Sequence, residues 1–485
     1  MTNNPLTVFN PDLFESNLDA FKQILSSAIR DSLVRKGKVL VQKEIDEILR
    51  ELDFDALIAR GGGDLPALGK IILDNSNRLH HPRYFGHQVA VPMLTSVLGD
   101  LISGVTNNGM AVYEMGPAGS AIERGLIRWL LAKIGPGWGS GDGVLTHGGS
   151  LANLSCLLAA RAKVLPDAWE NGMPLTDVRG SGIPEPRTSV SGHVLLTSEA
   201  AHYSVSRAAA ILGFGSKSVI PLPVDASLRV KPESLESVFA DVARAGKKVL
   251  AFVANAGATP TGAYDPLRPI GEFCRAHNIW LHVDGAHGAS ALVSEKHRAL
   301  LDGIEFANSL CWDMHKLLGT SVVCGAALFR DAATLAASYA QHAPYLFSDI
   351  EKPGEDLSKN TFECTKSILS LKLFFNLAAV GEKGLAAHVE HLFARTLELY
   401  EYIRARAGFE CRCEPQCNIL CFRFGTDSAL QDKIRHQIVR DGDFYLTRTT
   451  LDGAAWLRLV IMNPFTEVPD ITALCDEIER HADEV

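Results

Sequence analysis

Long apolar runs are missing from this sequence of 485 residues. No stretch approaches the roughly 18 consecutive apolar residues of a membrane-spanning helix, so we expect no membrane segment. The first residues have neither the basic nor the apolar part of a secretory signal, so we expect a cytoplasmic location. Basic residues are outnumbered, 47 Lys and Arg against 56 Asp and Glu. The resulting net charge of −9 argues against nucleic acid or an anionic membrane surface as a partner.

Cysteine is also scarce, with ten residues in the whole chain, too few for a scaffold stabilised by disulfides. Four of them are closely spaced in a way that also occurs in zinc sites: Cys411, Cys413, Cys417 and Cys421. Their apolar neighbours favour two strands around the turn 414–416, with the cysteines as small buried hydrophobic residues. We therefore expect no metal site in this chain.

The pattern of apolar residues changes twice along the chain and predicts three parts. Residues 1–95 contain amphipathic helical segments, as in 12–33 and 41–57. Residues 96–366 alternate short apolar runs with helical stretches, which predicts the large domain. Residues 367–485 begin with a long helix and predict a smaller α+β domain.

Near-continuous apolar runs in the middle part predict strands that are buried on both faces of a mainly parallel sheet. They lie at residues 194–196, 249–253, 279–283, 309–312 and 326–329. The fold class is therefore α/β. The Pro- and Gly-rich segment 165–190 is expected to be a surface excursion from this sheet.

Two of these predicted strands are followed by residues with unusual chemistry, Asp284 and Lys316. An isolated acid in this place usually caps the next helix, and with His282 and His287 it also offers metal ligands. Alternate strand residues face opposite sides, however, which argues against a metal. A lysine at the end of an apolar strand needs a partner for its amine. A lysine that forms a Schiff base and a carboxylate that pairs with a pyridine nitrogen are what pyridoxal phosphate (PLP) chemistry requires.

A turn that can bind phosphate lies earlier in the chain. Gly148 and Gly149 end an apolar strand, and a helix is predicted to begin at about Ser150. The free N–H groups and positive dipole of a helix start bind anions, and the Ser150 hydroxyl adds a donor. A serine that only caps the helix is the alternative.

In these motifs the sequence resembles the group II PLP-dependent amino-acid decarboxylases, the family of glutamate, aromatic-amino-acid, cysteine-sulfinate and diaminobutyrate decarboxylases. The resemblance implies PLP fold type I, which is aspartate aminotransferase-like, and a homodimer with the active site at its interface. It also implies PLP as the cofactor and decarboxylation of an L-amino acid to the corresponding amine. The chain departs from the family at Met314, where the family has proline before the His-Lys pair.

The same resemblance assigns a role to each matching residue. Lys316, His202 and Asp284 would be catalytic, with His202 stacked on the pyridine ring and able to transfer protons. The implied cofactor contacts are these three residues together with Gly148, Gly149, Ser150, Thr259, Ala286 and His315. The implied substrate contacts are Tyr84, Phe85, His87 and Arg458, of which Arg458 would hold the substrate carboxylate by a bidentate pair.

A departure from the family lies in segment 348–361, which matches its mobile catalytic loop but contains no tyrosine. In the family a tyrosine of this loop is thought to return a proton after CO₂ leaves. Its absence leaves open an alternative reaction, decarboxylation with oxidative deamination to an aldehyde. A non-catalytic relative that binds PLP is the second alternative.

Overall fold

The computed structural model describes residues 5–173, 192–339 and 354–484. The chain divides into two compact units, each built from segments that are distant in sequence. Unit 1 consists of Met1–His87, Arg395–Arg412 and Ile419–Val485, and unit 2 of Gln88–Ala394 and Cys413–Asn418. The three-part division expected from the sequence, at 1–95, 96–366 and 367–485, stays a prediction.

A seven-stranded sheet in the order β2-β8-β7-β6-β5-β3-β4 forms the centre of unit 2. Its strands are β2 (Asp142–Thr146), β3 (His193–Ser198), β4 (Val219–Leu222), β5 (Lys248–Asn255), β6 (Trp280–Asp284), β7 (Ser309–Asp313) and β8 (Gly325–Phe329). Strands β4, β3, β5, β6 and β7, which are neighbours in that order, run parallel to one another, and β8 is antiparallel to both of its neighbours. The mainly parallel sheet predicted from the apolar runs is therefore confirmed.

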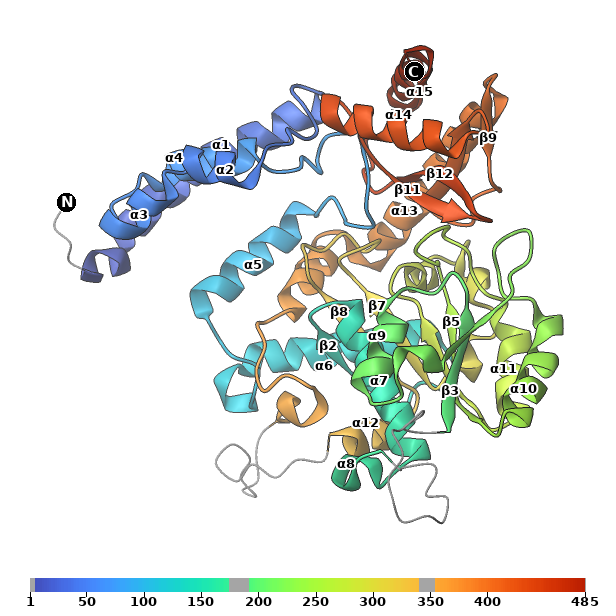
Figure 1. Ribbon diagram of the computed structural model, residues 1–485. Coiled ribbons are helices and arrows are strands. Elements are labelled where there is room, and N and C mark those ends of the chain that lie inside the picture. Colours follow the sequence, from blue (N-terminus) through green and yellow to red (C-terminus); the bar gives the residue numbers. More distant parts are fainter. Residues whose placement is uncertain (1–4, 174–191, 340–353, 485) are drawn as a thin grey trace, which may run out of the picture. The chain divides into compact units, whose positions relative to one another are not determined.

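Helices pack against this sheet and supply the apolar partners that its strands need. The helices of unit 2 are α5 (Leu94–Thr106), α6 (Pro117–Ile134), α7 (Gly149–Val164), α8 (Ala168–Asn171), α9 (Ser204–Ile211), α10 (Leu235–Arg244), α11 (Leu267–Ala276) and α12 (Ala332–Ser338). Helices α7 and α9 lie side by side (Figure 1), and α7 contacts β5, β6, β7 and β8. Small residues of α7, such as Ala152 and Cys156, let it approach Leu195 and Val253 of the sheet in one buried cluster.

Unit 1 has its own five-stranded sheet, in the order β1-β11-β12-β10-β9. Its strands are β1 (Tyr84–Phe85), β9 (Phe409–Cys411), β10 (Ile419–Phe424), β11 (Tyr445–Leu451) and β12 (Ala454–Val460). Strand β1 runs parallel to β11, and the other pairs are antiparallel. Two of the clustered cysteines, Cys411 and Cys421, lie in β9 and β10 as predicted, whereas Cys413 and Cys417 lie in the connection. Cys417 and Cys421 are buried as expected, but Cys411 and Cys413 are only half-buried.

The helices of unit 1 come from both ends of the chain. They are α1 (Pro11–Leu33), α2 (Ile45–Glu51), α3 (Phe54–Arg60), α4 (Leu65–Asp74), α14 (Ser428–Asp441) and α15 (Val468–Asp483). Helix α13 (Ser370–Ala405) belongs to both units, and Gly381, at φ 66°, interrupts its helical backbone. In the described part of the chain, no helix has the length and apolar character that a membrane span requires.

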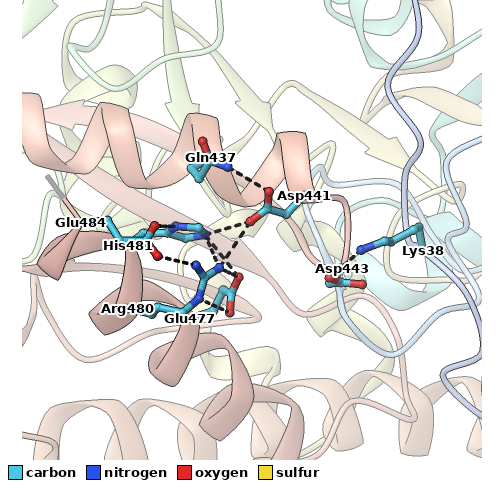
Figure 2. A network of polar contacts seen from close by, with 8 residues as sticks. All are labelled: Lys38, Gln437, Asp441, Asp443, Glu477, Arg480, His481 and Glu484. Atoms are coloured by element: carbon cyan, nitrogen blue, oxygen red, sulfur yellow. Dashed lines mark hydrogen bonds and ion pairs between the residues drawn. The ribbon is translucent and has the colours of Figure 1, made fainter.

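A polar network joins α14 to α15 (Figure 2). His481 is buried, and its Nε2 lies 3.0 Å from Asp441 and 3.2 Å from Glu477. These three residues can offer ligand atoms to a metal ion. However, the guanidinium of Arg480 already contacts both carboxylates, and Gln437 donates to Asp441. The network is therefore explained as a bridge between two helices.

Candidate active site

A pocket of about 290 Å³ lies at the carboxyl ends of the parallel strands of unit 2. Open α/β sheets place their ligands at this edge. Its wall includes every cofactor contact that the sequence predicted: Gly148, Gly149, Ser150, His202, Thr259, Asp284, Ala286, His315 and Lys316. The strand register explains part of this convergence, since Asn255, Asp284 and Cys311 lie side by side on β5, β6 and β7. We call this site the cofactor pocket.

Asp284 is held in the cofactor pocket by neutral donors. It is the last residue of β6 and is 8% exposed. The Asn153 amide donates to its Oδ2 at 2.9 Å, and the Ala286 backbone N–H donates to its Oδ1 at 3.2 Å. Neither donor carries a charge, so the carboxylate keeps its negative charge available for a cationic partner. A protonated pyridine nitrogen is such a partner.

Behind Asp284, His282 fixes the orientation of the Asn153 amide. The imidazole lies 3.0 Å from Asn153 Oδ1 through Nε2 and 3.0 Å from Ser309 Oγ through Nδ1. Burial lowers the pKa of His282 to about 4, against the opposing effect of Asp284. A neutral His282 donates to Asn153 and adds no positive charge. His287 contacts Asn418 instead, at 2.6 Å, so this arrangement gives no support to the metal alternative for Asp284.

His202 is oriented by the same amide. Asn153 donates to Ser204 Oγ at 3.0 Å, and that hydroxyl lies 2.8 Å from His202 Nδ1. The Ser204 backbone N–H also points at Nδ1, at 3.3 Å, so this nitrogen acts as an acceptor. Burial lowers the pKa of His202. The ring is therefore neutral and carries its proton on Nε2.

Asn153 is a functional residue that the sequence did not reveal. It is fully buried and contacts Asp284, Ser204 and His282. Its position in the sequence could have indicated this role, because Asn153 lies in the first turn of the helix predicted to begin at about Ser150, close to the expected phosphate site.

Lys316 lies in the cofactor pocket, and its Nζ is 3.2 Å from Asp313 Oδ2. Burial by itself lowers the pKa of Lys316, but the carboxylates of Asp313 and Asp284 outweigh it, and the pKa lies above its ordinary value. Two negative groups and one amine therefore share this end of the pocket.

The other end of the pocket is built to accept an anion. Gly148, at φ 91°, turns the chain so that α7 begins at Gly149 and presents the free N–H groups of its first turn. Ser150 and His315 are also in the wall. His315 is held by Cys324, whose carbonyl oxygen lies 2.9 Å from Nδ1. An anion site, an amine and an unneutralised carboxylate are what the phosphate, aldehyde and ring nitrogen of PLP require, so the residues fit the cofactor.

Three of the four predicted substrate residues, Tyr84, His87 and Arg458, belong to a second group, in unit 1. The Tyr84 ring stacks on Tyr445 with centroids 5.5 Å apart, and His87 Nε2 lies 3.1 Å from the Tyr445 hydroxyl. Arg458 is 5% exposed and donates to Thr447 Oγ1 at 3.2 Å. We call these five residues the Arg458 cluster.

The Arg458 cluster is linked electrostatically as well as by contacts. Burial lowers the pKa of His87, and the charge of Arg458 lowers it further. Burial raises the pKa of Tyr84, which Arg458 opposes. Phe85 lies apart from this cluster in the apolar core, stacked on Phe444. Its contact with substrate stays a prediction.

The segment that matches the family's loop is only partly described, because residues 340–353 lie outside the described ranges. The part that follows is anchored by contacts of two of its residues, Glu363 and Lys366. Glu363 lies 2.6 Å from His147 Nδ1, and the buried Lys366 donates to Glu123 at 2.5 Å and to the Leu145 carbonyl at 2.6 Å.

The chain is similar to known proteins along most of its length. The pyridoxal-dependent decarboxylase conserved domain matches residues 68–425. The L-2,4-diaminobutyrate decarboxylase of Acinetobacter baumannii is 31% identical over 428 residues, which cover 86% of this chain and 83% of the relative. The cysteine sulfinic acid decarboxylase of Rattus norvegicus is 30% identical over 483 residues, covering 95% and 94%. The crystal structure of mouse CSAD superposes with a TM-score of 0.87 at 28% identity, covering 98% of this chain and 100% of that chain.

The chain thus belongs to the pyridoxal-dependent decarboxylase family. It is a PLP-dependent enzyme that decarboxylates an amino acid to the corresponding amine. Neither the oxidative alternative nor the non-catalytic alternative gains support from these comparisons.

Proposed function

We propose that decarboxylation takes place in the cofactor pocket, with Lys316 as the residue that binds PLP covalently. When bound, the cofactor supplies a ring that accepts the electrons of the bond to the departing carboxylate. Asp284 would pair with the ring nitrogen, and the start of α7, with Ser150 and His315, would hold the phosphate. The observation that carries this proposal is the convergence of these groups on one pocket.

His202 is proposed to lie against the ring and to move a proton at its Nε2. The Ser204 contacts fix its Nδ1 as an acceptor, which leaves the Nε2 proton available to the pocket. This role would supply a proton without a tyrosine from segment 348–361. Arg458 is proposed to hold the substrate carboxylate, which would orient the bond that breaks.

Reduction with borohydride tests the assignment of Lys316. The reagent should fix the cofactor covalently, and peptide mapping should find the added mass on Lys316. The variant Lys316→Ala should take up no covalent label and show no turnover. A label on another lysine in the wild-type enzyme would overturn the assignment.

The substrate side chain is an open question that a panel of amino acids answers. CO₂ and amine should be released in equal amounts from the preferred substrate, without peroxide or oxygen uptake. Release of aldehyde and ammonia instead would establish the oxidative alternative. Turnover of no amino acid by cofactor-loaded protein would favour the non-catalytic alternative.

We also propose that the enzyme is a homodimer. Helix α5 exposes six apolar residues that recur along one stripe: Leu94, Val97, Leu98, Leu101, Ile102 and Val105. An exposed apolar stripe of this length is a typical protein interface, and a second copy is the partner that the family resemblance implies. The predicted cytoplasmic location is to be tested separately, by cell fractionation.

Light scattering on purified protein tests the dimer. The wild-type protein should have twice the mass of the 485-residue monomer. In Leu98→Glu the measured mass should fall toward that of the monomer. Val380→Glu is the matched control, since Val380 is similarly exposed on α13, outside the stripe. A monomeric wild-type enzyme with full activity would contradict the proposal.

A further inference from the structure

Asp313, the last residue of β7, is a second carboxylate in the cofactor pocket, and its surroundings differ from those of Asp284. It is 2% exposed, and its Oδ2 lies 3.2 Å from Lys316 Nζ. Its Oδ1 is buried without a hydrogen-bond partner among the described residues. Asp284 is satisfied by amide donors, whereas Asp313 faces the amine.

The Asp313 carboxylate occupies space that is open only because two neighbouring residues are glycines without a Cβ atom. A Cβ atom on Gly149 would lie 2.7 Å from Asp313 Oδ2, and one on Gly325 would collide with Oδ1. Gly325 is the residue directly opposite Asp313 in the β7–β8 ladder, and Gly149 begins α7. The carboxylate is therefore confined between two backbones and directed at Lys316.

A buried carboxylate in this position needs a compensating charge, because desolvation of an unpaired ion is costly. In the part of the chain that the structure describes, Lys316 is the closest cation. His315 lies farther away, with its Nε2 3.8 Å from Asp313 Oδ2.

Among the described residues, the other titratable groups that interact with Lys316 are Asp284 on β6, Cys311 on β7 and His202 before α9. Burial raises the pKa of Cys311 well above its usual value, which keeps that thiol neutral. His202 is neutral as described above. The two carboxylates therefore set the charge of the amine.

We propose that Asp313 is the counter-ion that holds Lys316 as an ammonium group and keeps a proton on its nitrogen after an aldehyde has been joined to it. The proposal rests on the proposed role of Lys316. In this step the ammonium nitrogen and the aldehyde carbon form a C=N bond, the C=O bond breaks, and the oxygen leaves as water with two of the three ammonium hydrogens. The third hydrogen stays on the nitrogen, so the positive charge beside Asp313 is conserved. Asp313 is thus a positioning residue that acts through Lys316.

Competitive labelling of the cofactor-free enzyme with acetic anhydride gives a readout that does not depend on activity. Mass spectrometry follows acetylation of Lys316 as a function of pH, and the midpoint reports the pKa of its amine. In Asp313→Asn this midpoint should fall by about one pH unit or more, the size of shift that a contacting opposite charge produces. Asp313→Ala, which removes the carboxylate without adding a donor, should shift it in the same direction. An unchanged or higher midpoint in both variants would overturn the proposal.

The holoenzyme gives a second readout. The absorbance band of the protonated cofactor–lysine linkage should persist to higher pH in the wild-type enzyme than in Asp313→Asn. Asp470→Asn is the matched control, because Asp470 is a buried carboxylate paired with Arg35 at 2.7 Å in unit 1, and it should move neither midpoint. If borohydride labels another lysine, the proposed function fails. If it labels Lys316 and the midpoints do not move, only the role of Asp313 fails.

Discussion

The cofactor pocket of unit 2 and the Arg458 cluster of unit 1 are assembled in different ways. The pocket takes its residues from the ends of neighbouring strands, from the connections that follow them and from the start of α7, so they gather at one edge of a single sheet. The Arg458 cluster joins β1, formed by residues 84 and 85, to β11 and β12 from the end of the chain. The end of a strand can be recognised from the local sequence pattern, whereas the pairing of two distant segments cannot. The difference also predicts which kinetic constant each group controls.

Asp284→Asn is expected to have the largest effect of the substitutions compared here, and to act through the cofactor pocket alone. The change is nearly isosteric, but it removes the charge that pairs with the ring nitrogen. We expect kcat to fall by about 10²–10³-fold, while circular dichroism and cofactor content stay close to those of the wild-type enzyme. Steady-state kinetics with a cofactor assay measures both. A wild-type kcat would remove Asp284 from its proposed role.

Arg458→Gln should have a smaller effect and a different signature. A hydrogen-bonded charge is worth about 1.5–3 kcal/mol, so kcat/KM should fall by about 10–100-fold, chiefly through a higher KM. Cofactor absorbance should be unchanged. Arg448→Gln is the matched control, since Arg448 lies on β11 and forms an exposed pair with Asp432 at 2.7 Å, which should matter little. Equal effects of Arg458→Gln and Arg448→Gln on kcat/KM would contradict the proposed role of Arg458 in binding substrate.

Acid should lower the stability of the fold, and this effect is expected in both units. The pKa of His282 in unit 2 and of His81 in unit 1 is lowered to about 4, mainly by burial. Below the ordinary pKa of about 6.5 each histidine is protonated in the unfolded chain but stays neutral in the folded chain until the pH approaches 4. The free energy of unfolding therefore decreases as the pH falls from 6.5 to 4. For His282 the loss reaches roughly 3 kcal/mol at most.

Denaturant unfolding at several pH values tests this effect. His282→Gln should flatten the dependence of the unfolding free energy on pH between 4 and 6.5, and His81→Gln should flatten it in the same direction. Parallel curves for variant and wild-type protein would show that burial does not control these histidines.

Much of the pocket was predictable because its determinants are local. A buried parallel strand needs a continuous apolar run, and Asp284 and Lys316 stand out because charged residues after such runs require partners. The start of α7 was equally visible, since a Gly-Gly-Ser turn after a strand predicts a helix N-terminus within one residue of the observed Gly149. The same local reasoning placed the strands β3, β5, β6, β7 and β8.

What the sequence determined by itself is the fold class, the cofactor and the residues at the strand ends, because periodicity and short motifs depend on neighbours along the chain. Only the tertiary structure revealed that Asn153 orients both Asp284 and His202, and that Asp313 is confined by Gly149 and Gly325 against Lys316. The grouping of Tyr84 and His87 with Tyr445 was equally hidden. The physical reason is the same in each case: a hydrogen bond or a steric fit between side chains of different elements depends on how strands and helices pack, and the sequence pattern of either segment alone does not reveal it.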